Sequence, residues 1–388
     1  MNFDKNAIQP AKHLYIHIPF CKRKCPYCDF YSESISGHNS RLISDYLEAL
    51  KQEIDEMRNY AGVIETVYIG GGTPSIIGAE NLVKLYENLI SDFEISDVAE
   101  ITIEANPDSL TPDFAKTAHD LGFNRISIGA QSFNDDNLKI LGRIHNSDQI
   151  FQAVDTIKNA GFSNFNLDLI TALPEQTISD VLRDLELAVS LNPTHLSVYN
   201  LIIEEDTPFE RMFSKHEFKM QSNEDISQIY TATQKFLTSK GFSHYEISNF
   251  TKQGFESKHN LGYWRYENYI GLGASAQSFL MPFRFANKRS VSEYINNDRN
   301  DFHETLSQTQ QLDEILMLGL RTAEGIEHKK LAEYCEIYEN LNKIKSDFTL
   351  SGKLNFENQR IAIKPEFFTV ADAIILIIAN ILSTAQDS

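Results

Sequence analysis

Between residues 15 and 203 the chain repeats one local pattern, in which a short β-rich run is followed by a segment with helical periodicity. The β-rich runs read, in order, LYIHIPF, TVYIGGG, EITIEANP, RISIGAQ, NFNLDLITALP and HLSVYNLII. Parallel neighbouring strands need a long crossover connection, which is usually a helix. Six such units therefore predict an α/β fold, with a parallel sheet that is either open and doubly wound or part of a (β/α) barrel.

The segments between these runs carry helix start and stop signals. In TPDFAKTAHDLG, Thr111 is placed to cap a helix, Pro112 suits its first position and Gly122 suits its end. SDQIFQAVDTIKNAG repeats this plan, with Ser147 as the predicted cap and Gly161 as the predicted terminator. The signals support helical crossovers between the strands.

Beyond about residue 205 the alternation fades, which indicates a change in organisation. We predict that residues 1–290 form the barrel and its extension, with the barrel core at about 13–205, and that a polar connector spans 290–310. Residues 305–388 are predicted to form a C-terminal helix-rich domain that begins with TQQLDEILMLGLRTAEG. A chain of 388 residues commonly divides into two units. The apolar run Ala373 to Leu382 is about half as long as a membrane span, so a buried helix is expected there.

Charge and cysteine usage restrict the partners and the compartment. A net charge of −19 weighs against general affinity for phosphate backbones, so we expect no nucleic-acid partner. FRFANKRS, residues 283–290, is the best candidate for a basic patch, although a solvated loop is the simpler interpretation. The polar start shows no secretory signal, and four cysteines with three clustered suit a reducing cytosol. We expect a cytoplasmic protein, with any membrane association peripheral.

Unusual polar motifs follow the predicted strands. They are the cysteine loop, GGGTPS, EANP, GAQSF, LDLITALP and EEDTPF. Barrels and open parallel sheets place their chemistry at the carboxyl ends of the strands. Six loops on one rim therefore predict a common site.

The cysteine loop holds Cys21, Cys25 and Cys28 within eight residues. A structural zinc usually takes four ligands, and since no second cysteine pair exists, it would need His17 or His38 here. An iron–sulfur cubane held by three cysteines instead leaves one iron without a protein ligand. Such an open position suits a metal centre that binds a small molecule.

The cysteine spacing C-x3-C-x2-C, with Tyr27 before the last cysteine, resembles the signature of the radical S-adenosylmethionine (radical SAM) superfamily. The resemblance implies a [4Fe–4S] cluster on the three cysteines, with S-adenosylmethionine on the open iron. It further implies reductive cleavage of that molecule to a 5′-deoxyadenosyl radical, fed by an electron donor such as a flavodoxin or ferredoxin.

Longer motifs resemble the oxygen-independent coproporphyrinogen dehydrogenase-like family, from Tyr15 to at least Arg321. They are YIHIPFC, GGGTPS, GAQSFN, NLDLITALPEQT, HLSVYNLIIEEDTPF and HYEISNF. This resemblance implies a partial (β/α)6 barrel with a C-terminal helical domain. It places S-adenosylmethionine against Tyr15, Tyr27, Gly71, Gly72, Thr73, Glu104, Gln131, Arg143 and Asp168. The glycines would let backbone amides approach the ligand, and Glu104 would accept hydrogen bonds from ribose hydroxyls.

Two local features favour the heme chaperone branch of this family. The dehydrogenases have a further cysteine where this chain has Phe30. The segment HNLGYW resembles the heme-binding motif of the chaperones and implies that His259, Asn260, Tyr263 and Trp264 contact heme. An imidazole can ligate iron, and aromatic rings offer flat apolar surfaces to a porphyrin. From the residues alone, aromatic packing at a domain junction explains the same segment.

The expected function is therefore binding of heme and its transfer to an unidentified acceptor protein, with catalytic use of the radical left open. The runner-up is oxidative decarboxylation of coproporphyrinogen III. A zinc-stabilised binding protein and a tRNA-modifying radical enzyme are further alternatives, the latter disfavoured by the acidic charge.

The chain also departs from the family pattern at several positions. Thr171-Ala172 and Glu175 stand in a segment where the family usually has glycines, and Gln277 stands where it has a histidine. Wider residues in that segment could reshape the cofactor pocket. Cys335 is predicted to be an ordinary core cysteine in an amphipathic helix.

Overall fold

The computed structural model describes residues 8–35 and 40–383, so His38 lies outside the described residues. One large sheet has the strand order β14-β13-β12-β11-β1-β4-β5-β6-β7-β8-β10-β9. Its strands, in chain order, are β1 (Ala11–Ile18), β4 (Ala61–Gly71), β5 (Ile95–Ala105), β6 (Arg125–Gln131), β7 (Phe165–Thr171), β8 (His195–Asn200), β9 (Ser243–Glu246), β10 (Asn249–Thr251), β11 (Tyr269–Leu272), β12 (Gln277–Leu280), β13 (Phe283–Asn287) and β14 (Asn300–Thr305).

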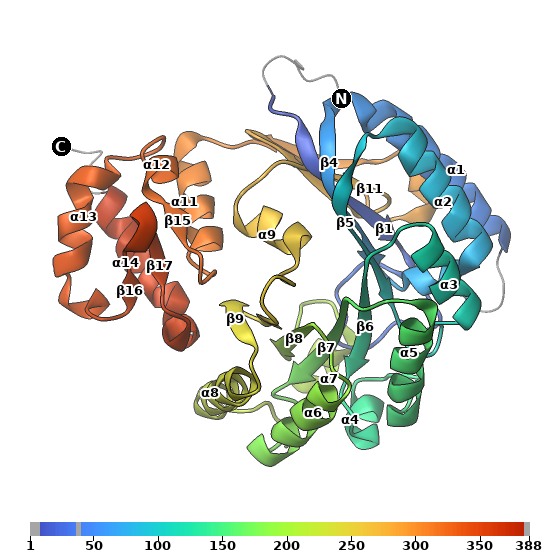
Figure 1. Ribbon diagram of the computed structural model, residues 1–388, viewed down its shortest axis with the longest axis horizontal. Coiled ribbons are helices and arrows are strands. Elements are labelled where there is room, and N and C mark those ends of the chain that lie inside the picture. Colours follow the sequence, from blue (N-terminus) through green and yellow to red (C-terminus); the bar gives the residue numbers. More distant parts are fainter. Residues whose placement is uncertain (1–7, 36–39, 384–388) are drawn as a thin grey trace.

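The six predicted β/α units form the centre of this sheet. Strands β1, β4, β5, β6, β7 and β8 pair as parallel neighbours in chain order. The sheet curves, and the crossover helices cover its convex face (Figure 1). These helices are α1 (Ser40–Met57), α2 (Gly78–Asp92), α3 (Pro112–Asp120), α4 (Asp135–Ile140), α5 (Ser147–Ala160) and α6 (Ile178–Ser190). The predicted α/β fold with a partial (β/α)6 barrel is confirmed.

Local signals explain most helix boundaries. The Thr111 hydroxyl accepts a hydrogen bond from the backbone of Phe114, and Gly161 ends α5 with a φ of 109°, both as predicted. The prediction of Ser147 as the cap of α5 was wrong by one residue. Asn146 caps the helix in a reciprocal capping box with Gln149, because an amide at position N3 can return a bond to the cap backbone.

Strand alternation gives the barrel an apolar outside and a polar interior. In β1, Leu14 and Ile16 are fully buried towards the helices, whereas His13, Tyr15 and His17 alternate with them. The same alternation places Arg125 and Ser127 of β6 on the inner face. His13, Tyr15 and His17 of β1 and Arg125 and Ser127 of β6 therefore share the inner face of the sheet.

The sheet continues past the barrel on the free side of β1. Strand β11 pairs with β1 in parallel, and β12, β13 and β14 follow as antiparallel strands. The predicted polar connector at 290–310 was wrong, since it contains helix α10 (Val291–Ile295) and edge strand β14. Alternating residues with many polar groups are typical of an exposed edge strand as well as of a linker.

The candidate basic segment FRFANKRS does not present free charge. Arg284 pairs with Glu304 and Glu314, Lys288 pairs with Glu293 and Asp298, and Arg289 pairs with Asp29. Its first residues form β13. Neighbouring carboxylates neutralise the segment, which agrees with the simpler interpretation.

Helices α7 (Pro208–Ser214), α8 (Asn223–Ser239) and α9 (Lys258–Trp264) follow β8, and α9 lies on the concave side of the sheet (Figure 1). The C-terminal region contains α11 (Gln308–Gly319), α12 (His328–Leu331), α13 (Ile337–Ser346) and α14 (Ala371–Ser383). It also contains a small sheet of β15 (Ile326–Glu327), β17 (Arg360–Ile363) and β16 (Leu354–Asn355). A short two-stranded pair, β2 (Phe20–Cys21) and β3 (Glu33–Ser34), closes the cysteine loop.

Two predictions about the C-terminal region need correction. Cys335 lies in the turn between α12 and α13, not in a helix, although it does pack against the second apolar core. The apolar run in α14 is buried on one face only: Ile374 and Ile378 enter the core, while Leu376 is 62% exposed. By length and composition Pro365–Leu382 could cross a membrane, but core helices of soluble proteins meet the same criterion.

Candidate cofactor site

The cysteine loop follows β1 at the carboxyl ends of the parallel strands. The β2–β3 pair and a hydrogen bond from the Cys28 amide to the Cys25 carbonyl (3.2 Å) shape the loop. The Pro26 carbonyl accepts a bond from the amide of Phe209 (3.0 Å), which attaches the loop to α7. Phe30, at the position that separates the two branches of the family, is 66% exposed and has no role in the core.

A chain of hydrogen bonds connects the cysteine loop to three other strand ends. Thr73 Oγ1 donates to Cys21 Sγ (3.4 Å) and accepts from Asn106 Nδ2 (2.8 Å). Asn106 Oδ1 accepts from Arg143 Nη2 (2.6 Å), and Arg143 Nη1 lies 3.5 Å from Cys25 Sγ. The loops after β1, β4, β5 and β6 thus form one closed network. Asn106 is its central member and was not singled out from the sequence, although its motif, EANP, was.

The glycine triplet packs tightly against strand β1 and its loop. A Cβ at Gly71 would lie 2.5 Å from the His17 ring, and one at Gly72 would lie 2.7 Å from the Phe20 carbonyl oxygen. Their amides are already used, because Gly71 donates to Glu104 Oε2 (3.2 Å) and Gly72 donates to the Ile18 carbonyl (2.9 Å). The glycines therefore serve close strand packing in this conformation, and their contact with S-adenosylmethionine stays a prediction.

Two half-buried carboxyl groups, those of Glu104 and Asp168, lie beneath the rim. Glu104 Oε1 accepts from the Tyr68 hydroxyl (2.7 Å), and burial raises the pKa of Glu104 to about 7, with nearby Asp168 adding to the shift. Asp168 accepts from Ser127 Oγ (2.9 Å) and Asn166 Nδ2 (2.8 Å), and burial raises its pKa as well. Such perturbed pairs in a polar interior are typical of ligand sites.

The remaining predicted contacts also lie on this side of the barrel. Tyr15 donates to His17 Nδ1 (2.9 Å), while His17 Nε2 donates to the Tyr31 carbonyl (2.8 Å). Burial lowers the pKa of His17 to about 4, so its ring is neutral and both nitrogens are occupied. Gln131 ends β6 with a φ of 66°, and Tyr27 packs against Phe209, with ring centroids 6.3 Å apart. His17 is therefore a structural residue in this arrangement and not a fourth metal ligand.

The donor set fits an iron–sulfur cluster with an open position. The thiols of Cys21, Cys25 and Cys28 lie on one loop, and all three residues are half-buried. Burial raises the pKa of Cys28 to about 11, so a bound cation is needed to make it a thiolate. Across residues 8–35 and 40–383 no three His, Cys, Asp or Glu side chains stand at metal-binding spacing in this conformation.

The predicted heme segment forms α9 on the concave side of the sheet, where His259 contacts the middle of β4 and β5. His259 is 1% exposed, and its Nδ1 and Nε2 lie 2.7 Å from Thr66 Oγ1 and 2.8 Å from the Tyr263 hydroxyl. Its ring stacks on Tyr68 at 5.1 Å, and its amide donates to Glu100. Both ring nitrogens are engaged inside the protein. His259 therefore does not present a free nitrogen in this conformation.

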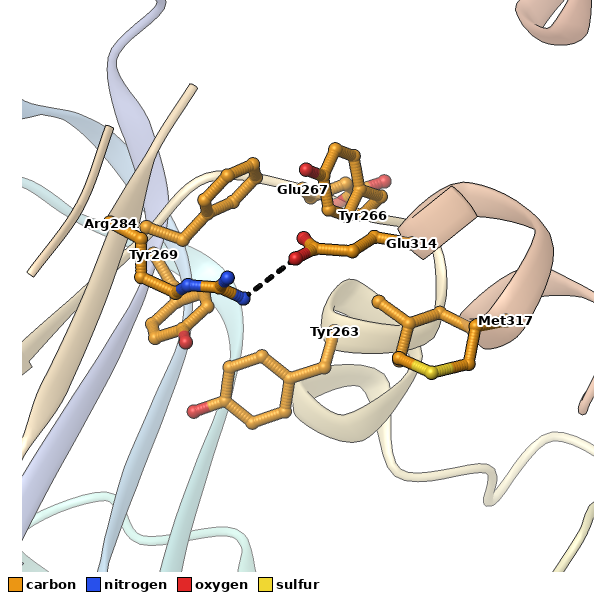
Figure 2. A pocket seen from close by; sticks show the side chains of 9 residues that line it. Tyr263, Tyr266, Glu267, Tyr269, Arg284, Glu314 and Met317 are labelled. Carbon is orange, nitrogen blue, oxygen red and sulfur yellow. Dashed lines mark ion pairs between the residues drawn. The ribbon is translucent and has the colours of Figure 1, made fainter. Parts of the chain in front are cut away.

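The other residues of the segment are more accessible. Asn260 and Trp264 are half-buried, and Trp264 borders a cavity of about 340 Å³ that reaches Arg265 and Lys330. Tyr263 borders a second cavity of about 260 Å³ together with Tyr266, Tyr269 and Met317. Figure 2 shows the Arg284–Glu314 ion pair (2.9 Å) spanning this second cavity. Both cavities lie between the barrel and the C-terminal region.

At two positions where the chain departs from the family pattern, the backbone has the left-handed conformation that glycine favours. Ala172 and Glu175 have φ values of 58° and 61°, which is the left-handed region. Ala172 is fully buried. Both residues therefore adopt a backbone conformation in which glycine would be less strained. Gln277 lies at the exposed start of β12.

Comparison with known proteins defines the class. The Radical SAM superfamily model matches residues 15–188. The structure titled "Coproporphyrinogen III oxidase (HemN) from Escherichia coli is a Radical SAM enzyme" aligns with a TM-score of 0.78 at 22% identity, covering 96% of this chain and 91% of that chain. The partial barrel and the three-cysteine loop are thus those of a radical SAM protein.

Sequence relatives narrow the family. The chain is 37% identical over 322 residues to "Heme chaperone HemW" of Lactococcus lactis, covering 82% of this chain and 84% of that protein. It is 39% identical over 269 residues to "Heme chaperone HemW" of Escherichia coli, covering 69% and 70%. The chain belongs to the HemW family, within the HemN-like radical SAM proteins.

Proposed function

We propose that this protein binds heme and transfers it to an acceptor protein, with a [4Fe–4S] cluster and S-adenosylmethionine at the barrel rim. The binding of the two cofactors is supported by one observation, the closed hydrogen-bond network at the rim. It runs from Cys21 through Thr73, Asn106 and Arg143 to Cys25. It explains why polar residues from four separate loops occur together. The heme part is supported by the name of the curated relatives and by the HNLGYW segment.

Different side chains at the rim would have different roles in binding the cofactors. Cys21, Cys25 and Cys28 would hold the cluster, which supplies an electron to the sulfonium of S-adenosylmethionine when both are bound. Arg143 places a guanidinium 3.5 Å from the sulfur of Cys25, beside the position where the cluster would bind. Glu104 and Asp168 offer carboxyl oxygens in the buried interior, where hydrogen bonds to a ligand are strong.

Heme would bind through the α9 segment, with His259, Asn260, Tyr263 and Trp264 in contact. The exposed loop at Lys22 to Lys24 would receive a small electron-donor protein such as a flavodoxin or ferredoxin. We place this activity in the cytoplasm, where thiols remain reduced. Fractionation of cells, with the heme-binding activity measured in each fraction, would test the location.

Hemin titration of the anaerobically reconstituted protein tests the function. We expect a Soret shift that saturates at one hemin per chain and delivery of that heme to an apo-cytochrome. His259→Ala should bind hemin more weakly, whereas His303→Ala, on the edge strand β14, serves as the control. Conversion of coproporphyrinogen III under the same conditions would contradict the chaperone assignment and support the dehydrogenase alternative.

A further inference from the structure

The turn after α13 carries the most exposed large apolar side chain of the described residues. Phe348, the first residue of the short 3-10 helix η4 (Phe348–Leu350), is 92% exposed. Leu350, two residues later, is 3% exposed and packs in the second apolar core. Leu350 therefore attaches the turn to the protein, while the ring of Phe348 stays in solvent.

Hydrogen bonds order this turn. Asp347 Oδ1 accepts from the amide of Thr349 (2.8 Å), as in a helix cap. Lys353 Nζ donates to the Thr349 carbonyl (2.6 Å), and Lys364 Nζ donates to the Gly352 carbonyl (2.7 Å). Two ammonium groups therefore lie on the same turn as the exposed ring.

The chain around the turn is basic, in contrast to the whole protein. Residues 343–364 include four lysines and one arginine against one aspartate and one glutamate, whereas the whole chain has a net charge of −19. Lys343 and Lys345 are exposed in the last turn of α13. Among the described residues, the four ammonium groups contact Asn340 Oδ1 (2.8 Å), the Phe356 ring (5.0 Å to its centroid) and the two turn carbonyls, and none of these partners is a carboxylate.

This combination of groups fits the surface of an anionic bilayer. The cations of residues 283–290 each pair with a carboxylate, whereas the four lysines around the turn keep their positive charge. Aromatic rings enter the interface between headgroups and acyl chains, and lysines beside them attract anionic lipids. Proteins that stack nucleic-acid bases combine aromatic rings with a basic groove, and a ring that is 92% exposed lies in no groove. A membrane therefore fits better than a single-stranded nucleic acid.

The position of the turn leaves the rest of the protein free. Helix α13 lies at the end of the molecule opposite the barrel (Figure 1). Contact of this end with a bilayer would leave the barrel rim uncovered. At physiological ionic strength charges are largely screened beyond about 8 Å, so acidic groups on the barrel would oppose this contact only weakly.

We propose that the turn at residues 347–353 docks on an anionic phospholipid membrane, with Phe348 inserted at the interface and the four lysines against the headgroups. The lysines are Lys343, Lys345, Lys353 and Lys364. The contact is peripheral, because one ring and its flanking charges do not span a bilayer. It is independent of heme binding, since all of these residues lie outside the HNLGYW segment.

Sedimentation of the full-length, reconstituted protein with lipid vesicles tests the proposal. We expect binding to vesicles of phosphatidylcholine and phosphatidylglycerol in a two-to-one ratio, weaker binding as salt is raised, and no binding to phosphatidylcholine alone. Equal binding to both kinds of vesicle, or binding to neither, would overturn the proposal.

A substitution of the exposed ring tests insertion. Phe348→Ser should bind the anionic vesicles about ten-fold more weakly, because the apolar ring is lost. The fold should survive, since the ring makes almost no contact with the protein. Phe302→Ser, at a 40% exposed phenylalanine of edge strand β14, is the control and should bind like the wild type. Unchanged binding by Phe348→Ser would overturn insertion at this turn.

Removal of charge tests the attraction to headgroups. The double variant Lys343→Gln and Lys345→Gln should bind about five-fold more weakly for each charge removed. Its control is the double variant Lys215→Gln and Lys219→Gln, which removes two exposed lysines beside α7. Equal affinities of the two double variants would overturn the role of the lysines.

Two further measurements distinguish a membrane from other partners. Phe348→Trp adds a second tryptophan to the single native one, and vesicles with brominated acyl chains should quench the added fluorescence. Absence of quenching would overturn insertion. Binding of a single-stranded RNA, or self-association without vesicles, that is weakened by Phe348→Ser would overturn the membrane assignment. None of these measurements includes hemin, so failure of the wild type to bind hemin would refute the proposed function and leave the membrane result unaffected.

Discussion

Arg143 Nη1 lies 3.5 Å from the sulfur of Cys25, although 118 positions separate the two residues in the chain. Asn106 holds the same guanidinium through a 2.6 Å bond and links it to Thr73. The cysteine loop is thus fixed by side chains from other strand ends, which makes its integrity depend on residues that bind no metal.

Replacing Asn106 by leucine should damage the cluster site without touching a cysteine. Arg143 and Thr73 would each lose a buried partner, which costs about 1–3 kcal/mol. We expect lower iron and sulfide content after anaerobic reconstitution. Asn124→Leu is the matched control, because Asn124 also bridges two groups, the Ile101 amide and the Ala99 carbonyl, but at the opposite end of the barrel. Equal iron content in both variants would argue against the network.

Restoring the family glycines should stabilise the protein. Ala172 and Glu175 occupy left-handed backbone, so Ala172→Gly and Glu175→Gly relieve strain and are each expected to raise the free energy of unfolding by up to about 1 kcal/mol. Glu186→Gly, in the middle of α6, should instead lower it by about 1 kcal/mol. Denaturant unfolding measures all three. Destabilisation by both restoring substitutions would show that the side chains make compensating contacts.

Buried Glu246 should make stability depend on pH. Burial raises its folded-state pKa to about 7, and Oε1 has no hydrogen-bond partner in the described chain. The folded state therefore holds the proton more tightly than the unfolded state, and stability falls as the pH rises from about 4.5 to about 7. Glu246→Gln should be more stable than the wild type at pH 8 by roughly 3 kcal/mol relative to their difference at pH 4. Urea unfolding across this range measures it, with exposed Glu186→Gln as the control. Parallel curves for Glu246→Gln and the wild type would contradict the prediction.

Removing the cluster should loosen the cysteine loop and leave the barrel folded. The apolar core is built from the strands and outer helices, while Lys22, Arg23 and Lys24 are exposed on the loop. After iron chelation, we expect several-fold faster trypsin cleavage at these three residues and an unchanged far-ultraviolet circular dichroism spectrum. Cleavage at Lys84, on outer helix α2, should not change. Loss of the spectrum would indicate that the cluster supports the whole fold.

Much of the fold could be predicted from the sequence because it follows from local patterns. Periods of two and 3.6, together with caps such as Thr111 and terminators such as Gly161, identify strands and helices residue by residue. The edge strand β14 was missed because its polar residues, without a buried face, look like a connector. The helix cap at α5 was displaced by one residue because two adjacent polar residues could both serve.

The sequence by itself determined the six β/α units, the three cysteines on one loop and the set of polar residues at the strand ends, since these depend on order and spacing along the chain. Tertiary structure alone decided which of these residues meet. It brought Arg143 to Cys25 and assigned the amides of Gly71 and Gly72 to neighbouring acceptors. It also placed the Thr66 hydroxyl within hydrogen-bond distance of both His13 and His259. Hydrogen bonding and burial depend on contacts across the barrel. The spacing of residues along one strand does not specify which residues of distant strands they will contact.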